Sequence, residues 1–346
     1  MVDYNRAGVP LMELVTEPDF TNGADVRAFS EEYQLILKYI GASDADMEKG
    51  LMRVEVNVSL TNADGSYGTK VEIKNLNSIA AAAASVDYEM IRQKELIESG
   101  GEVVAETRGW DENKKQTFSQ RSKEEAQDYR YFPEPDLPPL KILGTMNNEQ
   151  GTRTEGGFYI DEIMAMLPEL PQARRERFKV QYGLPDADIE IFTSDKELGN
   201  YFEHVASELG DNSLAKLAAN YLITEIRKHG GAKGIKIMPT DFADLMRRIA
   251  KKEISSSGAQ TVLEEMFKTG NSPEHIIKEK DLGQVSDSGA LDAVVDKVIA
   301  DNAKPVEDYR KGKEASLKFL IGMAMRESKG KGNPQVLEEI IKNKLK

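Results

Sequence analysis

Cysteine is absent from the chain, and histidine is scarce. Without cysteine there are no disulfides, no thiolate metal ligands and no cysteine nucleophile. The three histidines, His204, His229 and His275, lie far apart in the sequence, and none is assigned a catalytic role. If the protein handles amide nitrogen, it therefore does not act as a cysteine-type glutaminase on its own.

Long apolar runs and standard phosphate-binding motifs are missing as well. No run approaches the ~20 residues that a membrane-spanning helix needs. The first residues also lack the basic-then-apolar pattern of a signal peptide, so we expect a cytoplasmic protein with no membrane association. Neither G-x-x-x-x-G-K-[ST], G-x-G-x-x-G nor H-E-x-x-H occurs, so nucleotide or metal use is not indicated by a standard motif.

Acidic residues outnumber basic residues over the whole chain, but the C-terminal segment is basic. The formal net charge of the 346 residues is −13, which argues against a general nucleic-acid coat. Residues 304–346 nevertheless contain 11 Lys or Arg against 6 Asp or Glu. This basic end is either a solvated helical face, which charge alone favours, or an RNA-facing tail.

The hydrophobic period changes along the chain and divides it into three parts. The first part predicts a helix over 26–40 that stops at Gly41, an antiparallel hairpin from 51–60 and 68–75, a helix over 78–98, and two short strands around a turn at 111–115. Later segments predict helices over 215–231, 240–253, 259–270, 272–279 and 314–328, with a last helix after Pro334. The helix over 314–328 has one apolar stripe, formed by Leu317, Leu320, Ile321 and Ala324. We therefore expect an α+β fold with domains at 1–167, 168–281 and 282–346.

The predicted hairpin carries a crowded polar face. Strand alternation places the following residues on one side of it: Arg53, Glu55, Asn57, Lys70, Glu72 and Lys74. Opposite charges across strands often do no more than stabilise a solvent-facing surface, and the residues alone favour that interpretation. The functional alternative is a bowl in which carboxylates hold Mg²⁺ and lysines meet phosphates. Glu13 and Glu17 would add carboxylates if their segment forms a strand beside the hairpin.

Two connecting segments have a structural and a functional interpretation each. Asn75, Asn77 and Ser78 suit the capping of the following helix, and phosphate binding at its N-terminus is an added hypothesis. In DYRYFPEPD (128–136), the prolines favour an extended arm that is either a rigid connector or a holder for Glu134. Arg130 in this arm can pair with a carboxylate or a phosphate.

Several ordered motifs span the chain: VDYNRAGVPLMELVTEPD (2–19), TKVEIKNLNS (69–78), SVDYEMIRQKELIESGG (85–101), ETRGWDE (106–112), DYRYFPEPDLPPL (128–140), LPELPQARRERF (167–178) and VEDYRKGKEASLKFLIGMAMRESKGKGNPQ (306–335). Together they resemble the family of B subunits of the aspartyl/glutamyl-tRNA amidotransferases, GatB. The resemblance implies a mixed α/β cradle with a kinase-like site, a helical domain, and a small helical tail that touches tRNA.

The resemblance also implies an activity. Such a protein uses ATP and Mg²⁺ to phosphorylate the side-chain carboxylate of Glu-tRNA(Gln) or Asp-tRNA(Asn), and ammonia then displaces phosphate. The ammonia comes from a partner amidase, the A subunit of the complex, and a small C subunit clamps the pair. Glutamine hydrolysis by a partner agrees with the lack of cysteine in this chain.

The same resemblance suggests the site residues. Glu13 and Glu55 match metal-binding carboxylate positions of the family, with Glu72 as a further metal ligand. Glu13, Glu55 and Glu134 are the predicted catalytic residues, and the predicted nucleotide-binding residues are Lys70, Lys74, Asn75 and Arg130. The predicted tRNA-binding residues in the basic tail are Lys311, Lys313, Lys318, Arg326, Lys329 and Lys331.

The sequence departs from the family pattern in two places. Members often carry Asp where this chain has Glu55, and they begin well upstream with a G-L-E-V-H strand that completes the metal site. We therefore expect a chain that is truncated at its N-terminus. The alternatives to a catalytic role are a catalytically incomplete tRNA-binding scaffold fragment of the complex and a structural protein whose tail binds only partners.

Overall fold

A computed structural model describes residues 4–5, 8–122, 141–143, 157–226, 235–283, 288–328 and 331–345. The chain forms two compact units, Met1–Pro171 and Gln172–Lys346. The first unit contains strands and helices, and the described part of the second is helical apart from an isolated bridge between Ile254 and Gly283. The expected α+β fold is therefore confirmed.

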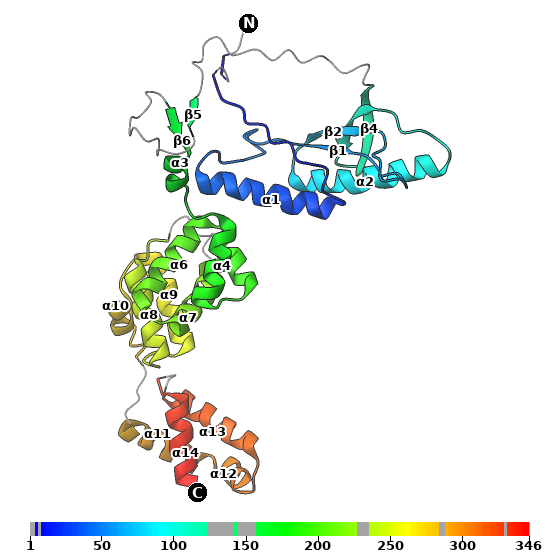
Figure 1. Cartoon of the computed structure of the whole chain (residues 1–346). Helices are drawn as coiled ribbons and strands as arrows, with labels where there is room; N and C mark the ends of the chain where they lie inside the picture. The colour runs from blue at the N-terminus through cyan, green and yellow to red at the C-terminus, as the bar shows by residue number, and fades with distance from the viewer. Residues whose placement is uncertain are drawn as a thin grey trace. The chain divides into compact units, whose positions relative to one another are not determined.

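The main sheet of the first unit has the strand order β1-β2-β3-β4 (Figure 1). Strand β1 (Val54–Val58) pairs antiparallel with β2 (Val71–Leu76), which confirms the predicted hairpin. Strand β3 (Glu106–Asp111) pairs antiparallel with β4 (Gln116–Ser122), as predicted around the turn at 111–115. The two hairpins are joined by parallel pairing of β2 with β3, a connection that requires the crossover helix α2 (Ile79–Glu98).

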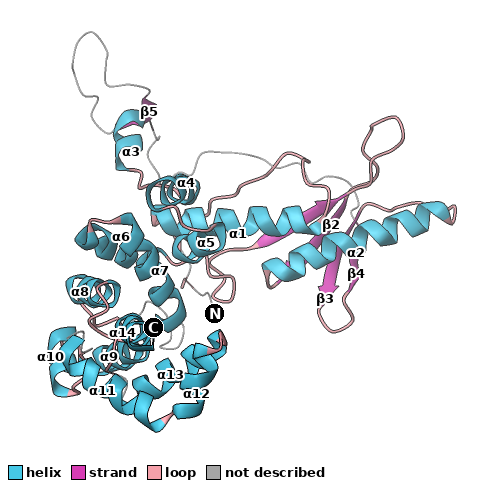
Figure 2. Cartoon of the chain, turned by 90° about the horizontal axis from the view of Figure 1, so that it is seen from below, coloured by secondary structure: helices cyan, strands magenta, loops and turns pink. Residues whose placement is uncertain are grey.

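Helix α2 covers one face of this sheet (Figure 2). Its first turns are built from alanine, so the helix lies close to the strands, and Ala82 is fully buried with Ile73 of β2. Alternate residues Val56 and Val58 of β1 and Trp110 of β3 complete the core of the unit. The opposite face of β1 and β2 is left to the polar residues.

Helix α1 (Gly23–Ile40) packs along α2. The side chain of Asn22 caps it by accepting a hydrogen bond from the amide of Asp25, and Gly41 ends it in the left-handed conformation, as predicted. Gly23 is required by close packing, because a Cβ there would lie 2.3 Å from the carbonyl oxygen of Ala83. The amide of Gly23 also donates to the Asp87 carboxylate at 2.7 Å.

The remaining described part of the first unit is small. Strands β5 (Lys141–Leu143) and β6 (Gly157–Tyr159) form a two-stranded parallel sheet, and helix α3 (Ile160–Met166) follows directly.

The second unit contains two separate hydrophobic clusters. The first spans Phe178 to Ile276 and includes stacked Phe192 and Phe202 rings with centroids 4.6 Å apart. The helices that build it are α4 (Pro171–Tyr182), α5 (Asp186–Ser194), α6 (Lys196–Leu209), α7 (Asn212–Ile226), α8 (Pro239–Ala250), α9 (Ser256–Thr269) and α10 (Pro273–Glu279). Where the sequence predicted helices in this region, each is present, and the described ends lie within a few residues of the predicted ones; the predicted end at 231 lies outside the described residues.

The second cluster joins the last four helices: α11 (Ser288–Asp301), α12 (Ala303–Arg310), α13 (Glu314–Glu327) and α14 (Pro334–Leu345). On α13, Leu317, Leu320 and Ala324 are buried, which confirms the predicted apolar stripe. The two clusters agree with a division of the helical region, but the domain boundaries at 167 and 281 stay a prediction.

Candidate functional site

The polar face of β1 and β2 is shaped by a β-bulge. Val56 lies opposite Ile73 and Val54 lies opposite Leu76, so the single residue Glu55 faces the two residues Lys74 and Asn75. Asn75 adopts a left-handed conformation with φ of 60°. Asparagine is one of the few residues that tolerate this region, and bulges of this kind re-aim neighbouring side chains. Asn75 is therefore a bulge residue, and the helix cap that follows is Ser78.

The bulge brings Lys74 between two carboxylates. Its Nζ lies 3.2 Å from Oε2 of Glu55 and 3.4 Å from Oε1 of Glu72. The hydrogen bond to Glu55, together with the charges of both carboxylates, raises the pKa of Lys74 above its ordinary value, against the opposing effect of burial. Lys74 is therefore protonated at neutral pH. The three side chains of Glu55, Glu72 and Lys74 together have a formal charge of −1.

Glu72 is also held from the neighbouring strand. The Thr107 hydroxyl of β3 donates to Oε2 of Glu72 at 3.1 Å, so the carboxylate is fixed by contacts from two strands. The Glu72 side chain is 17% exposed, whereas that of Glu55 is 47% exposed. Glu72 is therefore the carboxylate held by contacts on both oxygens, and Glu55 is the more exposed one.

We predict that the conformation of Asn75 is needed for this arrangement. Asn75→Val should destabilise the protein by about 1–2 kcal/mol, because a β-branched residue is strained in the left-handed region, whereas Asn75→Gly should be nearly neutral. Urea unfolding of the two variants measures the difference. Equal stability of the valine and glycine variants would contradict the role of the bulge.

The structure places Glu13 differently from the expectation. No strand forms over residues 9–20, and this segment is exposed, with the neighbouring Leu11 91% exposed. The condition under which Glu13 and Glu17 would join the hairpin face, a strand beside it, is therefore not met among the described residues, and the role of Glu13 stays a prediction. Within the described part of the chain, no three acidic or histidine side chains gather as a metal site.

The other predicted residues of the cradle divide into two groups. Lys70 lies directly before β2 and is exposed. It alternates with Glu72 and Lys74 along the strand, in the register of the same face. Arg130 and Glu134 lie outside the described residues, so their roles stay predictions.

Sequence reasoning missed a buried polar network on the opposite face of the sheet. Glu89 of α2 is fully buried, and Arg92 donates two hydrogen bonds to it, at 2.9 and 2.5 Å. Gln93 and Thr117 donate to the same carboxylate at 3.0 and 2.9 Å. Each oxygen of the Glu89 carboxylate therefore accepts two hydrogen bonds, and a buried charge is tolerated in a core when it is satisfied in this way.

The network joins the helix to three strands. Arg108 of β3 lies 3.6 Å from the Glu89 carboxylate and donates to the hydroxyl and carbonyl oxygens of Thr117 on β4. Gln93 also donates to the carbonyl oxygen of Val58 on β1. The signal in the sequence is the i, i+3, i+4 spacing of Glu89, Arg92 and Gln93 on one helix face, which resembles an ordinary exposed face.

The predicted tRNA-binding residues of the tail fall into two sets. Lys311 pairs with Glu307 at 2.6 Å and Lys313 pairs with Asp308 at 3.0 Å. Lys318 and Arg326 of α13 are exposed and have no carboxylate partner within the described residues. Lys329 lies outside the described residues, and Lys331 is half-buried.

The described part of the chain is thus an α+β unit with a charged sheet face, followed by helices whose last segment is basic. Comparison with known proteins identifies the relatives. Residues 1–148 match the GatB/GatE catalytic domain, and residues 200–345 match the GatB domain. Among the described helices, none is both long and apolar enough to cross a membrane.

Named relatives match the chain from end to end. The B subunit of the aspartyl/glutamyl-tRNA(Asn/Gln) amidotransferase of Carboxydothermus hydrogenoformans is 44% identical, and the alignment covers 100% of this chain and 70% of the relative. The B subunits of the same name from Caldicellulosiruptor saccharolyticus and Persephonella marina are 43% and 41% identical, with 70% and 71% of each relative covered. The chain therefore belongs to the family of aspartyl/glutamyl-tRNA(Asn/Gln) amidotransferase B subunits.

Proposed function

We propose that the chain activates the side-chain carboxylate of Glu-tRNA(Gln), Asp-tRNA(Asn) or both with ATP, so that ammonia can convert it to the amide. The observation that carries this proposal is the match of residues 1–148 to the GatB/GatE catalytic domain, together with the charged face built inside that region. The partners in this proposal are the amidase (A) and small (C) subunits of the amidotransferase and the tRNA, in the cytoplasm.

The charged face fits a nucleotide with its metal ion. Mg²⁺ prefers oxygen ligands and is commonly bound by one or two carboxylates together with substrate phosphates. Glu55 and Glu72 supply two carboxylates on one face, and Lys74 supplies a cation between them. Glu55 and Glu72 would supply oxygen ligands to the metal, and Lys74 would meet a phosphate.

When bound, ATP would supply a phosphoryl group to the carboxylate. Phosphate, and not oxide, would then be the leaving group that ammonia displaces. Mg²⁺ would shield the negative charges of ATP and of the carboxylate as they approach each other. Lys74 stabilises negative charge at the site of transfer, since a preorganised cation costs no reorganisation during the reaction. Thr107 orients Glu72 by its hydrogen bond, and the bulge at Asn75 sets the position of Lys74.

Glu13, Arg130 and Glu134 are proposed to complete this site, and Lys70 to contact a phosphate. Their support is their place in the family's motifs. The domain assignment is likewise a proposal: a cradle at 1–167, a helical domain at 168–281 and a tRNA-binding tail at 282–346.

The test is reconstitution with the A and C subunits, glutamine, ATP and Glu-tRNA(Gln). We expect Gln-tRNA(Gln) to form only when ATP and this chain are both present, with phosphate released in step with the product. If the chain binds tRNA but releases no phosphate in response to it, the chain is instead a catalytically incomplete tRNA-binding scaffold fragment.

A further inference from the structure

We propose that a pocket between α12 and α13 of the tail binds one unstacked RNA base, and that Asp308 selects guanine. The proposal rests on the proposed function, because it assumes that the tail contacts tRNA. It adds a base-binding subsite to a contact that was predicted from charge alone.

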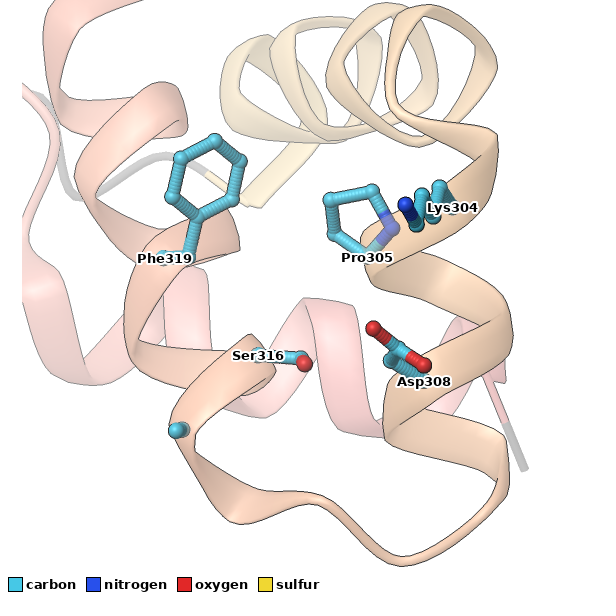
Figure 3. A pocket seen from close by; sticks show the side chains of 6 residues that line it. Lys304, Pro305, Asp308, Ser316 and Phe319 are labelled. Carbon is cyan, nitrogen blue, oxygen red and sulfur yellow. The ribbon is translucent and has the colours of Figure 1, made fainter.

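The pocket is an open hollow with rings on two sides (Figure 3). Phe319 of α13 and Pro305 of α12 lie on opposite sides of it, and its volume is about 250 Å³. Phe319 is 50% exposed although α13 has a buried face available, so its ring is not needed by the core. Exposed aromatic rings are the usual platforms on which unstacked bases are held in single-stranded RNA.

The polar groups of the pocket lie at one end. Figure 3 shows the Ser316 hydroxyl and the Asp308 carboxylate pointing toward each other below the ring and the proline. Asp308 is held by Lys313 at 3.0 Å, and its side chain is 31% exposed. A fixed carboxylate accepts hydrogen bonds only, and guanine presents two adjacent N–H donors on its Watson–Crick edge.

One cation lines the pocket and others lie on the same helix as Phe319. Lys304 is the lining residue, and the exposed Lys318 precedes Phe319 on α13. Arg326 lies two helical turns beyond Phe319 on the same stripe of α13, about 10 Å along the axis. Gly322 leaves the stripe between them open, with nothing within 4 Å of the position of a Cβ.

These cations are available for phosphates. Lys304, Lys318 and Arg326 have no carboxylate partner in the described part of the tail, whereas Lys311 and Lys313 are engaged with Glu307 and Asp308. A polyanion with a flat base therefore fits the surface better than an apolar peptide does. The base occupies the pocket, and the flanking phosphates follow α13.

The first experiment measures the affinity of the chain for a tRNA(Gln) transcript at several salt concentrations. Phe319→Leu should weaken binding about tenfold with an unchanged salt slope, and Phe319→Tyr should restore it, because stacking is insensitive to salt. Lys318→Ala should lower the salt slope by about one, whereas the control Lys342→Ala, whose lysine pairs with Glu338 on α14, should not. Thermal unfolding checks that each variant folds.

The base preference is tested by competition. Guanosine monophosphate should compete with the transcript better than adenosine monophosphate, and Asp308→Asn should abolish that difference. Equal competition by the two nucleotides in the wild-type chain would overturn the selection of guanine.

Cross-linking identifies the occupant. A chain with Phe319→p-benzoylphenylalanine, mixed with transcript and the A and C subunits, should cross-link to a nucleotide of a single-stranded loop. Cross-linking to a stem or to a partner protein would overturn the proposal. A wild-type chain that does not bind the transcript would remove the proposed tRNA contact itself, whereas wild-type binding with an unaffected Phe319→Leu variant would remove only the base pocket.

Discussion

Replacement of Lys74 by alanine is expected to lower ATP-dependent amidation by about 10²–10³-fold without unfolding the protein. Lys74 is the charged group that the bulge positions between Glu55 and Glu72, and no other described lysine is paired with both. Its loss removes a preorganised cation and leaves two carboxylates to repel the nucleotide. The measurement is the rate of Gln-tRNA(Gln) formation at saturating and limiting ATP in the reconstituted complex.

The controls separate charge from position. Lys114→Ala removes an exposed lysine from the turn between β3 and β4 and should leave the rate unchanged. Lys74→Arg keeps the charge and should retain part of the activity, with a raised KM for ATP, because the larger guanidinium does not fit the same position. A Lys74→Ala complex with the wild-type rate would show that the charged face is only a stabilised surface.

The largest effect on stability is expected at Glu89. Glu89→Ala should lower the free energy of unfolding by about 3–5 kcal/mol, because it leaves Arg92 without its buried carboxylate partner and leaves Arg108 with Glu106 alone. The hydroxyl of Thr117 and the amide of Gln93 lose their acceptor as well. Urea unfolding monitored by circular dichroism measures the change.

A neighbouring glutamate of the same helix provides the control for Glu89. Glu95 of α2 is exposed, so Glu95→Ala should change the unfolding free energy by less than about 0.5 kcal/mol. Glu89→Gln should give an intermediate loss, because the amide keeps an acceptor but not the charge. Similar stabilities of the Glu89→Ala and Glu95→Ala variants would mean that the network contributes little.

Local patterns in the sequence predicted most elements of the first unit. The alternation in LMRVEVNVSL and GTKVEIKN predicted the β1–β2 hairpin and the side to which Glu55, Glu72 and Lys74 point. The predicted stop at Gly41 ends α1, and Asn22, an amide residue of the type that favours N-caps, begins it. These features depend on contacts between residues close in sequence, which a pattern of spacing describes well.

The bulge at Asn75 could not be predicted in the same way. The residues KNLNS suit a helix cap as well as a bulge, and the choice depends on the register of β2 against β1 and β3. Whether the segment around Glu13 forms a strand beside the hairpin could not be read from the sequence for a related reason, and residues 9–20 form no strand. A strand forms only where a partner offers its backbone groups, and the alternation of side chains says nothing about that partner.

The class of fold, the polar face of the hairpin, the apolar stripe of α13 and, through the motifs, the family follow from spacing and residue type in the chain. Packing in three dimensions places Lys74 between Glu55 and Glu72, and it buries Glu89 against Arg92 and Arg108. It also pairs Lys311 and Lys313 with carboxylates, whereas Lys318 and Arg326 have no carboxylate partner among the described residues. These contacts do not follow from the sequence, because hydrophobic periodicity indicates only which side of a helix or strand is buried. The partner of a charged side chain depends on which elements pack together and in what register.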